Sequence, residues 1–430
     1  MKIKYLHKSD GIVYRILWPL TPVMHWGFFK KVYFHNREGV PGDKPVLLAV
    51  NHPTAFMDPL LLCSFLHTPI YNMTRGDLFE KPFFRKLLES ANMFPVFRLR
   101  DGYSEQDRND AVFDFCYRKM TQQQVVAVYV EGEHHLEKRV LPCQKGIARI
   151  AFGAYEKNRM DDLQIVPAGC NYVYGDRPRD VAMVNIGQPL YVRDYWEIYQ
   201  KNPGRAILLL CRDIELALKE LCFHIQSPED DLLGERLLML HRSDHPEPLL
   251  PTVKFEKRRF LAEKAVLNRM NALPADQKAL LRNNTNAYAE ALEAAGLEDG
   301  PLVNPAWGSP IWWILFICGF VPFLIGYASS WPLMRLSHWV ADTKVKKKEF
   351  YSSVIIGVGF LAGLFYYGML LLLCIATINP YWIAMGLTLP LLGWFAMFYR
   401  ELWARWNAAQ RAAKHPEKER LLALRAAIGY

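Results

Sequence analysis

Several features that often identify a protein class are missing from this sequence. Its eight cysteines are scattered, with no C-x-x-C pair and no cluster of cysteine and histidine at the spacing of metal ligands. We therefore expect reduced thiols and no metal site. The sequence also has no G-x-S-x-G motif, which excludes an ordinary serine hydrolase built on a nucleophile elbow.

Charged residues are missing from two long stretches near the C-terminus. None lies between Asp299 and Arg335, and none lies between Glu349 and Arg400. As a helix, the second stretch would be about 75 Å long, which is enough for two spans of roughly 20 residues each. We therefore predict two transmembrane helices within residues 351–399.

The composition fits a membrane-associated protein that binds anions. Apolar residues make up 51% of the chain and aromatic residues 13%, which is high for a soluble protein. The formal net charge of +9 suits an anionic lipid surface or a polyanionic substrate. We expect membrane lipid as a partner and no nucleic acid, because no basic stretch is combined with a known nucleic-acid-binding motif.

The stretch PVLLAVNHPTAFMDPLL, residues 45–61, carries the clearest chemical signal. Its apolar run 46–50 predicts a buried strand that ends at Asn51 and His52. Asp58 and the proline that follows it predict the N-cap and first turn of a helix. On one regular helix, positions 52 and 58 would lie about 240° apart, so the two side chains can meet only across a loop.

His52 and Asp58 are therefore candidate catalytic residues. An imidazole held by a carboxylate can act as a general base towards an alcohol, because the carboxylate fixes the tautomer and stabilises the imidazolium that forms. In the alternative interpretation, His52 ends a strand and Asp58 caps a helix, and neither takes part in chemistry.

Two further blocks combine an apolar strand with polar residues or proline. The block NMFPVFRLRD, residues 92–101, ends with Arg98 and Arg100. Two arginines that leave a strand suit an anionic group such as phosphate, although a solvated basic turn is the alternative. The block IVPAGCNY, residues 165–172, predicts another strand, which is interrupted by its proline.

A fourth block begins with the clear apolar strand VVAVYV, residues 125–130. Glu131, Gly132 and His135 follow this strand within five residues. The sequence LPCQKGIA then predicts the start of a helix and contains Lys145.

These four blocks, in their order along the chain, resemble the glycerolipid acyltransferases, which place fatty acyl chains on glycerol 3-phosphate or lysophosphatidic acid. The resemblance covers roughly residues 34–192. The five residues between His52 and Asp58, and the histidine and LP-x-x-K-G after EG, are closest to the fungal-type glycerol-3-phosphate/dihydroxyacetone-phosphate acyltransferases and their bacterial relatives. Glu133 and His134 stand where the commoner form has Thr-Arg, so the phosphate-binding arginine of that block has no counterpart at this position.

The resemblance implies a role for each motif residue. His52 would be the general base, Asp58 would orient it, and Arg98 would hold the phosphate of the acceptor. Glu131 and Gly132 would belong to the block that binds the acceptor and shapes the site. The full set of implied substrate-binding residues is Asn51, which would fix the loop, Arg98, Arg100, Glu131, Gly132, His135 and Lys145.

The implied reaction moves a fatty acyl chain from a thioester to a hydroxyl group of a phosphorylated glycerol. The donor would be acyl-CoA or acyl-acyl-carrier-protein, the acceptor would be glycerol 3-phosphate or 1-acylglycerol 3-phosphate, and no cofactor would be needed. Two alternatives remain open. One is an O-acyltransferase for dihydroxyacetone phosphate or a lyso-amino-acid lipid, and the other is a non-catalytic membrane scaffold with the same fold.

The alternation of strands and helices predicts an α/β domain with a mixed sheet flanked by helices, at residues 34–226. Before it, residues 1–33 combine aromatic and basic side chains, as in a segment at the membrane interface or an amphipathic helix packed on the domain. After it, residues 227–300 predict a polar helical hairpin of structural role, or a lid or spacer. The predicted strands lie near residues 46, 94, 126, 165 and 183, and the predicted helices of the hairpin are 253–272 and 276–295.

Basic residues predict how the apolar C-terminal region meets the membrane. The loop 335–350 and the tail 400–430 are both basic and should be cytoplasmic. Residues 301–334 contain five prolines, and a full span there would separate the catalytic domain from its thioester donor. We therefore predict a re-entrant or interfacial helical hairpin kinked at Pro322. The protein should be integral to a bacterial inner membrane, with its catalytic domain on the cytoplasmic face.

Overall fold

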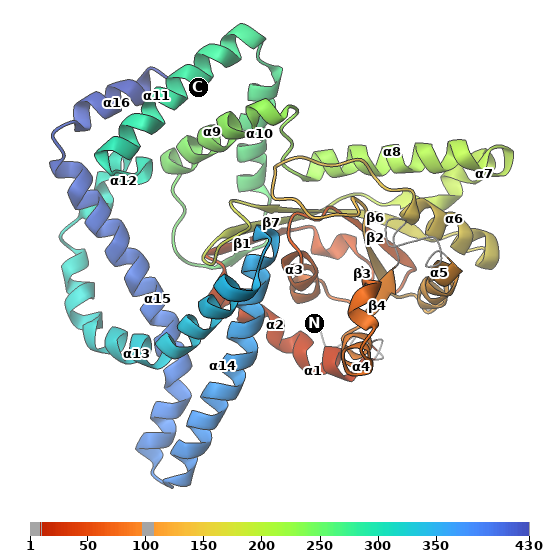
Figure 1. The fold of residues 1–430 in the computed structure, drawn as a ribbon, viewed down its shortest axis with the longest axis horizontal. Coiled ribbons are helices and arrows are strands. Elements are labelled where there is room, and N and C mark those ends of the chain that lie inside the picture. Colours follow the sequence, from red (N-terminus) through yellow and green to blue (C-terminus); the bar gives the residue numbers. More distant parts are fainter. Residues whose placement is uncertain (1–8, 10, 97–106, 430) are drawn as a thin grey trace. The chain divides into compact units, whose positions relative to one another are not determined.

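The computed structural model describes Ser9, residues 11–96 and residues 107–429, and it divides into two compact units (Figure 1). The sheet unit includes two short segments that lie far along the sequence from its main body. It comprises Met1–His224, Leu249–Phe260 and Lys347–Ser353, and the helical unit comprises Ile225–Pro248, Leu261–Lys346 and Val354–Tyr430.

A mixed sheet forms the centre of the sheet unit. Among the described residues it has nine strands in the order β4-β3-β5-β2-β6-β7-β1-β9, with β8 paired to β6. The five neighbouring strands β4, β3, β5, β2 and β6 run parallel. The strands β7 and β8 pair with β6 in the antiparallel direction. The bounds are β1 (Lys31–His35), β2 (Val46–Val50), β3 (Ile70–Arg75), β4 (Met93–Val96), β5 (Val125–Tyr129), β6 (Gln164–Tyr172), β7 (Val181–Ile186), β8 (Leu190–Tyr191) and β9 (Val253–Lys254).

The predicted α/β fold with a mixed sheet is confirmed, and each of the five predicted strands is present. The central strand β2 shows why these strands could be predicted. All of its residues, VLLAV, are fully buried, as expected for a parallel strand that is covered on both faces. The strands β1, β3, β8 and β9 were not predicted, because β8 and β9 have two residues each and the other two mix polar with apolar side chains.

One face of the sheet is covered by α5 (Asp107–Thr121), α6 (Gly146–Asn158) and α8 (Pro203–Leu221). Leu47 and Ala49 of β2 share a buried core with apolar side chains of these helices, such as Ile150 and Ile214. The other helices of the unit are α1 (Ile12–Leu17), η2 (Trp18–Leu20), α2 (Thr21–Phe28), η3 (Arg37–Gly39), α3 (Met57–Phe65), η4 (Gly76–Phe79), α4 (Pro82–Ser90), η7 (Val192–Tyr195) and α7 (Trp196–Lys201).

The N-terminal helices α1 and α2 bury only part of their apolar surface in the sheet unit. The Trp18 indole N–H donates to the carbonyl oxygen of Cys63, and the Tyr14 hydroxyl accepts from the N–H of Ile70. Five large apolar side chains of α1, η2 and α2 remain exposed, namely Ile12, Ile16, Leu20, Val23 and Trp26. The segment that the sequence assigns to a membrane interface therefore both packs on the domain and presents apolar side chains outward.

The sheet unit extends beyond the predicted bounds of 34–226. β1 begins at Lys31, within the segment predicted to be interfacial, and residues 249–260 bring β9 alongside β1. The edge of β1 presents backbone N–H and C=O groups that need partners, and β9 supplies them over two residues.

The polar region 227–300 contains more than the predicted hairpin. α10 (Arg258–Ala272) and α11 (Ala275–Ala295) correspond to the predicted pair. α10 begins at Arg258 rather than at Val253, because Val253 and Lys254 form β9. The remaining helices of this region are η8 (Pro228–Asp230), α9 (Asp231–Asp244) and α12 (Asp299–Val303).

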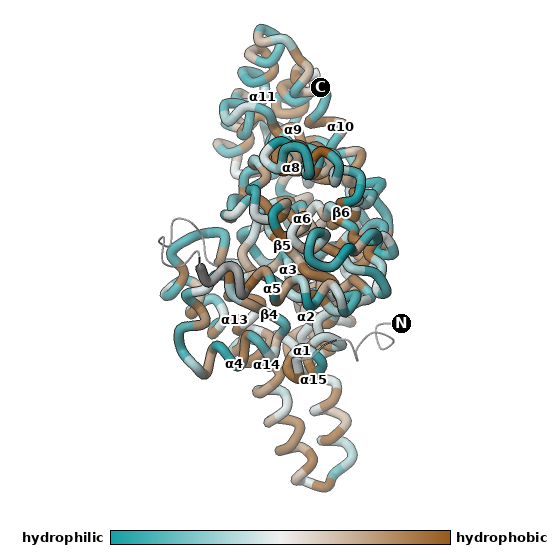
Figure 2. Tube along the Cα trace, turned by 90° about the vertical axis from the view of Figure 1, so that its right-hand side faces the viewer, coloured by the Kyte–Doolittle hydropathy of each residue, from teal (hydrophilic) through white to brown (hydrophobic). Residues whose placement is uncertain are grey.

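Within the described residues, three helices are long and apolar enough to cross a membrane (Figure 2). They are α13 (Trp312–Lys344), α14 (Tyr351–Ala376) and α15 (Pro380–Lys414). The side chain of Asn379 caps α15 by accepting from the N–H of Tyr381. The other short helices are η9 (Pro305–Gly308), η10 (Lys348–Phe350) and α16 (Lys418–Ala426).

The predicted hairpin within residues 301–334 is wrong. α13 is one helix that continues through Pro322 and Pro332, and Figure 1 shows it bent. Each proline removes one backbone donor but does not end a helix that is supported by neighbouring helices. α15 gives this support, because Gly326 lies so close to α15 that a Cβ atom would collide with the carbonyl group of Leu392.

Candidate active site

Polar side chains gather at the carboxyl ends of the parallel strands β2, β5 and β6. Asn51 and His52 follow β2, and Glu131 lies two residues after β5. Asn51 also bridges to β6, since its amide donates to the carbonyl oxygen of Cys170 at 2.9 Å and accepts from the N–H of Cys170 at 2.7 Å. This edge is where α/β sheets most often bind ligands.

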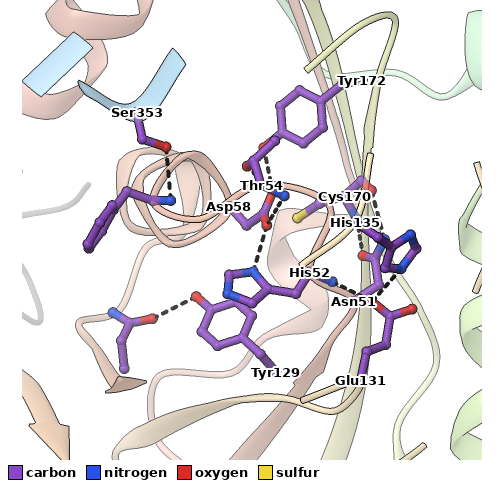
Figure 3. Close-up of polar contacts among 12 residues, drawn as sticks. Asn51, His52, Thr54, Asp58, Tyr129, Glu131, His135, Cys170, Tyr172 and Ser353 are labelled. Carbon is purple, nitrogen blue, oxygen red and sulfur yellow. Dashed lines mark hydrogen bonds and ion pairs between the residues drawn. The ribbon is translucent and has the colours of Figure 1, made fainter. Parts of the chain in front are cut away.

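His52 and Asp58 meet across the loop between β2 and α3 (Figure 3). Nδ1 of His52 lies 2.9 Å from Oδ2 of Asp58, and the two side chains are 10% and 0% exposed. The predicted capping role of Asp58 is wrong, because α3 begins at Met57 and its N-cap is Phe56. Asp58 therefore lies inside the first turn, with its carboxylate directed back to the loop.

The Asp58 carboxylate is surrounded by donors. Oδ2 accepts from the N–H of Thr54 at 3.0 Å, and Oδ1 accepts from the hydroxyls of Thr54 at 2.9 Å and Tyr172 at 2.6 Å. An ionised carboxylate can only accept, so Nδ1 of His52 must carry the hydrogen that lies between them. In the neutral imidazole, Nε2 then carries the lone pair, and it makes no hydrogen bond to any residue that the structure describes.

Two tyrosines support this pair from neighbouring strands, Tyr172, which is buried, and Tyr129, which is half-buried. Burial, and then the negative charge of Asp58, raise the pKa of Tyr172 and of Tyr129 well above 10, so both remain phenols at neutral pH. Tyr172 is thereby kept as a donor to Asp58. The Tyr129 ring stacks on the His52 imidazole with centroids 4.2 Å apart, and its hydroxyl donates to Oδ1 of Asn72 at 3.1 Å.

The sequence did not single out Thr54, Asn72, Tyr129 or Tyr172 as site residues. A signal was present for the two tyrosines, since each lies at or next to the end of a predicted strand. An aromatic ring there can pack at the sheet edge while its hydroxyl reaches a polar site.

Glu131 is 3% exposed, and its carboxylate holds loops together. Oε2 accepts from the backbone N–H of His52 at 2.8 Å, and Oε1 accepts from that of Leu141 at 2.9 Å. Nε2 of His135 lies 3.3 Å from Oε2. Two of the predicted substrate-binding residues, Glu131 and His135, are therefore bonded to each other.

The environment of His135 favours its protonated form. Burial lowers the pKa of this imidazole, but the hydrogen bond to Glu131 and the charges of Glu131 and Glu137 outweigh burial, so its pKa is raised above 6.5. Its ring nitrogens lie near both acids, with Nδ1 at 3.6 Å from Oε2 of Glu137.

The other predicted residues have different surroundings. Gly132 has φ +74°, a left-handed conformation that glycine adopts without strain, and it turns the chain after β5. Lys145 is exposed at the N-cap of α6. Arg98 and Arg100 lie outside the described residues.

The backbone N–H groups of the loop after β2 are already engaged. The N–H of His52 donates to Glu131 and that of Thr54 to Asp58, while the N–H of Ala55 donates to the carbonyl oxygen of Glu349. The N–H of Phe56 donates to the hydroxyl of Ser353 at 3.0 Å (Figure 3). These four amides are therefore not available to bind an anionic reaction intermediate.

A cavity of about 20 Å³ lies beside Asn51, Pro53, His135 and Tyr172. This volume is enough for about one water molecule, and His52 is not among its lining residues. Within the described residues, no group of three His, Cys, Asp or Glu side chains is placed to hold a metal ion.

Comparison with known proteins gives consistent matches over this part of the chain. Residues 31–171 match the family model described as Acyltransferase. Glycerol-3-phosphate O-acyltransferase 2 of Saccharomyces cerevisiae is 26% identical over 117 residues, which are 27% of this chain and 16% of that protein. An uncharacterized acyltransferase of Schizosaccharomyces pombe is 26% identical over 149 residues, which are 33% of this chain and 21% of that protein.

The chain therefore spans only about a fifth or less of the length of these relatives. Among solved structures, the 1-acyl-sn-glycerophosphate (LPA) acyltransferase PlsC of Thermotoga maritima is 16% identical, with a TM-score of 0.35 over 48% of this chain and 78% of that chain. A similarity of this size carries no functional conclusion. The part of the chain that bears His52 and Asp58 is therefore similar to acyltransferases of the glycerolipid type.

Proposed function

We propose that this protein is a membrane-bound O-acyltransferase that moves a fatty acyl chain from an acyl thioester to a hydroxyl of glycerol 3-phosphate or 1-acylglycerol 3-phosphate. The name of the Saccharomyces cerevisiae relative supports the phosphorylated glycerol acceptor. The observation that carries the proposal is the hydrogen bond of 2.9 Å between His52 and Asp58 at the carboxyl ends of the parallel strands.

In the proposed reaction, His52 acts as the general base and Asp58 as the group that orients it. Nε2 accepts the proton of the acceptor hydroxyl while the hydroxyl oxygen attacks the thioester carbonyl carbon. The C–S bond then breaks, the ester forms, and the imidazolium returns its proton to the leaving thiolate. Asp58 stabilises the imidazolium between these steps.

The anionic tetrahedral intermediate needs a donor at its oxygen. The N–H groups of residues 52, 54, 55 and 56 are engaged within the protein, so the donor must come from another part of the site. Acyl-CoA or acyl-acyl-carrier-protein is the proposed co-substrate, and no cofactor is needed for this chemistry.

Arginine and lysine are the proposed ligands of the acceptor phosphate. Arg98 and Arg100 follow β4, which is parallel to the strands that carry His52 and Glu131. Guanidinium groups bind phosphate through paired hydrogen bonds. Lys145 lies at the N-terminus of α6, where the helix dipole adds a partial positive charge.

The position of Lys347–Ser353 supports a particular path of the chain through the membrane. This segment hydrogen-bonds to the loop of His52 and Asp58, which supports a position on the cytoplasmic side together with that loop. Between Phe260 and α13, all of which the structure describes, there is no candidate span. Both ends of α13 would then lie on the cytoplasmic side, and only α14 and α15 would cross the membrane.

Tryptophans at one end of α13 fit this path. The Trp313 ring contacts the rings of Trp403 and Trp406, with centroids 5.9 and 5.1 Å apart, in the part of α15 that follows Arg400. Tryptophan clusters next to arginine are typical of the membrane interface. The exposed apolar side chains of α1 and α2 would add a second contact with lipid.

Protease sites inserted after Lys346 and after Ile378, both exposed, test this path. In vesicles with the cytoplasmic face outward, we expect cleavage after Lys346 and none after Ile378. A third site after Gly308 should be cleaved together with the one after Lys346. Protection of only one of these two would mean that α13 crosses the membrane.

The reaction itself is tested with membranes that contain the full chain. Glycerol 3-phosphate, dihydroxyacetone phosphate, 1-acylglycerol 3-phosphate and a lyso-amino-acid lipid are compared as acceptors, each with acyl-CoA and with acyl-acyl-carrier-protein. We expect acyl transfer to a phosphorylated glycerol and a higher acceptor KM in Arg98→Ala for phosphorylated acceptors. Transfer only to an unphosphorylated acceptor would refute the proposed substrate class, and no transfer to any acceptor would favour a non-catalytic scaffold.

A further inference from the structure

The segment Lys347–Ser353 belongs to the sheet unit, although helices of the other unit precede and follow it in the sequence. It comprises η10 and the first residues of α14, a candidate membrane span. No residue of this segment was predicted to belong to the site. Its contacts, however, fall on the loop that carries Thr54 and Asp58.

Two successive amides of that loop are bonded to the segment. The N–H of Ala55 donates to the carbonyl oxygen of Glu349 at 3.3 Å, and the N–H of Phe56 donates to Oγ of Ser353 at 3.0 Å. Ser353 is 6% exposed, so its hydroxyl is a buried hydrogen-bond acceptor rather than a group at the surface. The Asp58 carboxylate accepts from the N–H of Thr54. The segment accepts from the next two N–H groups of the loop, those of Ala55 and Phe56.

Ser352 supports the same loop indirectly, through Gly175. Its hydroxyl donates to the carbonyl oxygen of Gly175 at 2.8 Å. A Cβ atom on Gly175 would lie 3.5 Å from Cγ2 of Thr54, so Gly175 is in the layer next to the threonine that bonds to Asp58. The segment therefore contacts the loop directly and also contacts the residue on which Thr54 packs.

A row of rings connects the segment to the catalytic imidazole. The Phe350 ring meets the His134 ring edge to face, with centroids 5.0 Å apart at 90°. The His134 ring meets the His52 ring in the same manner, with centroids 4.9 Å apart at 80°. Edge-to-face contacts of this kind favour one relative orientation of the rings.

We propose that Lys347–Ser353 is a positioning segment for the catalytic pair. Ser353 holds the loop in the shape that brings the Asp58 carboxylate to Nδ1 of His52, and Phe350 limits rotation of the His52 ring through His134. Neither residue contacts the reacting atoms. The inference rests on the proposed function, because it concerns the general base of that reaction.

Ser353→Ala is the central test, because it leaves the N–H of Phe56 without an acceptor and lets the loop relax. We expect kcat to fall about tenfold, with both KM values within about twofold of the unaltered chain. Ser353→Thr keeps the hydroxyl and should restore kcat to within about threefold. Phe350→Ala, a second variant, should lower kcat about threefold.

A matched control is Ser337→Ala. Ser337 is also a buried serine of the C-terminal region, and its hydroxyl donates to the carbonyl oxygen of Leu333 within α13. Its substitution should leave kcat unchanged. A fall in kcat in this control equal to that in Ser353→Ala would mean that any disturbance of the membrane helices has the same effect, and would overturn the inference.

A double-mutant cycle separates positioning from general support of the fold. If Ser353 acts through Asp58, Ser353→Ala should cost less than about twofold in kcat when Asp58 is already Asn. An equal tenfold loss in both backgrounds, or full activity of Ser353→Ala, would overturn the inference while leaving the proposed function intact. Absence of transfer by the unaltered chain would overturn the proposed function, and this inference with it.

Discussion

Two buried carboxylates contact His52, and they do so in different ways. Asp58 is 0% exposed and receives the imidazole, two hydroxyls and one backbone N–H. Glu131 is 3% exposed and receives two backbone N–H groups and the ring of His135. One acid therefore meets the ring of His52, whereas the other meets its backbone.

This difference separates an acid placed to orient the proposed base from an acid that holds loops together. A carboxylate on an imidazole nitrogen stabilises the charge that appears when the other nitrogen takes a proton. A carboxylate that accepts from backbone N–H groups does not stabilise the protonated imidazole in this way. It fixes the two loops that carry those N–H groups relative to each other. Both acids lie where the chain passes from a buried strand to a helix, so only their donors distinguish the two roles.

The largest effect on kcat is expected from replacing His52, which both acids contact. Replacing His52 by Ala removes the proposed base and should lower kcat by about 10³-fold. His67→Ala is the matched control, since His67 pairs with Glu38 at 2.9 Å outside the site and its loss should not change kcat. Transfer assays with the preferred acceptor measure both variants, and full activity of His52→Ala would exclude it as the base.

The comparison becomes sharper with Asp58→Asn. An asparagine keeps the volume but can offer its NH2 group to Nδ1, which favours the wrong tautomer of His52. We expect kcat of the folded protein to fall about 10²-fold, together with a loss of thermal stability, because the same NH2 group would leave the N–H of Thr54 without an acceptor. Assays of kcat and a thermal melt on the same sample distinguish the two effects. A loss of stability without a loss of kcat would indicate that Asp58 has the same structural role as Glu131.

Local sequence was enough to predict the pair but not its surroundings. His52 and Asp58 lie in one short stretch, in which a buried strand, a loop and a helix start follow one another, and this order allows the two side chains to meet across the loop. Tyr172 and Ser353 reach Asp58 and its loop from 114 and 297 residues away along the chain. No local pattern marks a serine at the start of an apolar helix as part of a catalytic loop.

The prolines of α13 show a case in which a local sequence pattern gave a wrong prediction. Five prolines within residues 301–334 predicted a break and a return of the chain. Two of them, Pro322 and Pro332, instead lie inside a single helix. Helix packing overrides the local preference there, because Gly326 and Gly393 allow α13 and α15 to approach closely.

Glu131→Gln tests whether the second acid is structural. The amide of glutamine can accept from one loop but turns its NH2 towards the other, leaving a buried N–H unpaired. The loss of about 1–3 kcal/mol should lower the thermal midpoint by roughly 3–10 °C. We expect kcat of the folded protein to fall less than about tenfold. A loss of kcat as large as that of Asp58→Asn, at an unchanged midpoint, would remove the distinction between the two acids.

The smallest expected effect is a pH dependence of stability, carried by His135. Its pKa in the folded protein is raised above the ordinary value of 6.5, since Glu131 and Glu137 outweigh burial. A raised pKa means that protonation stabilises the folded state, with the full contribution below the unfolded pKa and a progressive loss as the pH rises through the folded pKa. The thermal midpoint of the unaltered chain should therefore exceed that of His135→Gln by more at pH 5.5 than at pH 9. Because Glu131 supplies the main stabilising contact, the same comparison made in the Glu131→Gln background should show a smaller pH dependence. A difference in midpoint that is independent of pH would show that His135 is held neutral, and that Glu131 acts on the two backbone amides alone.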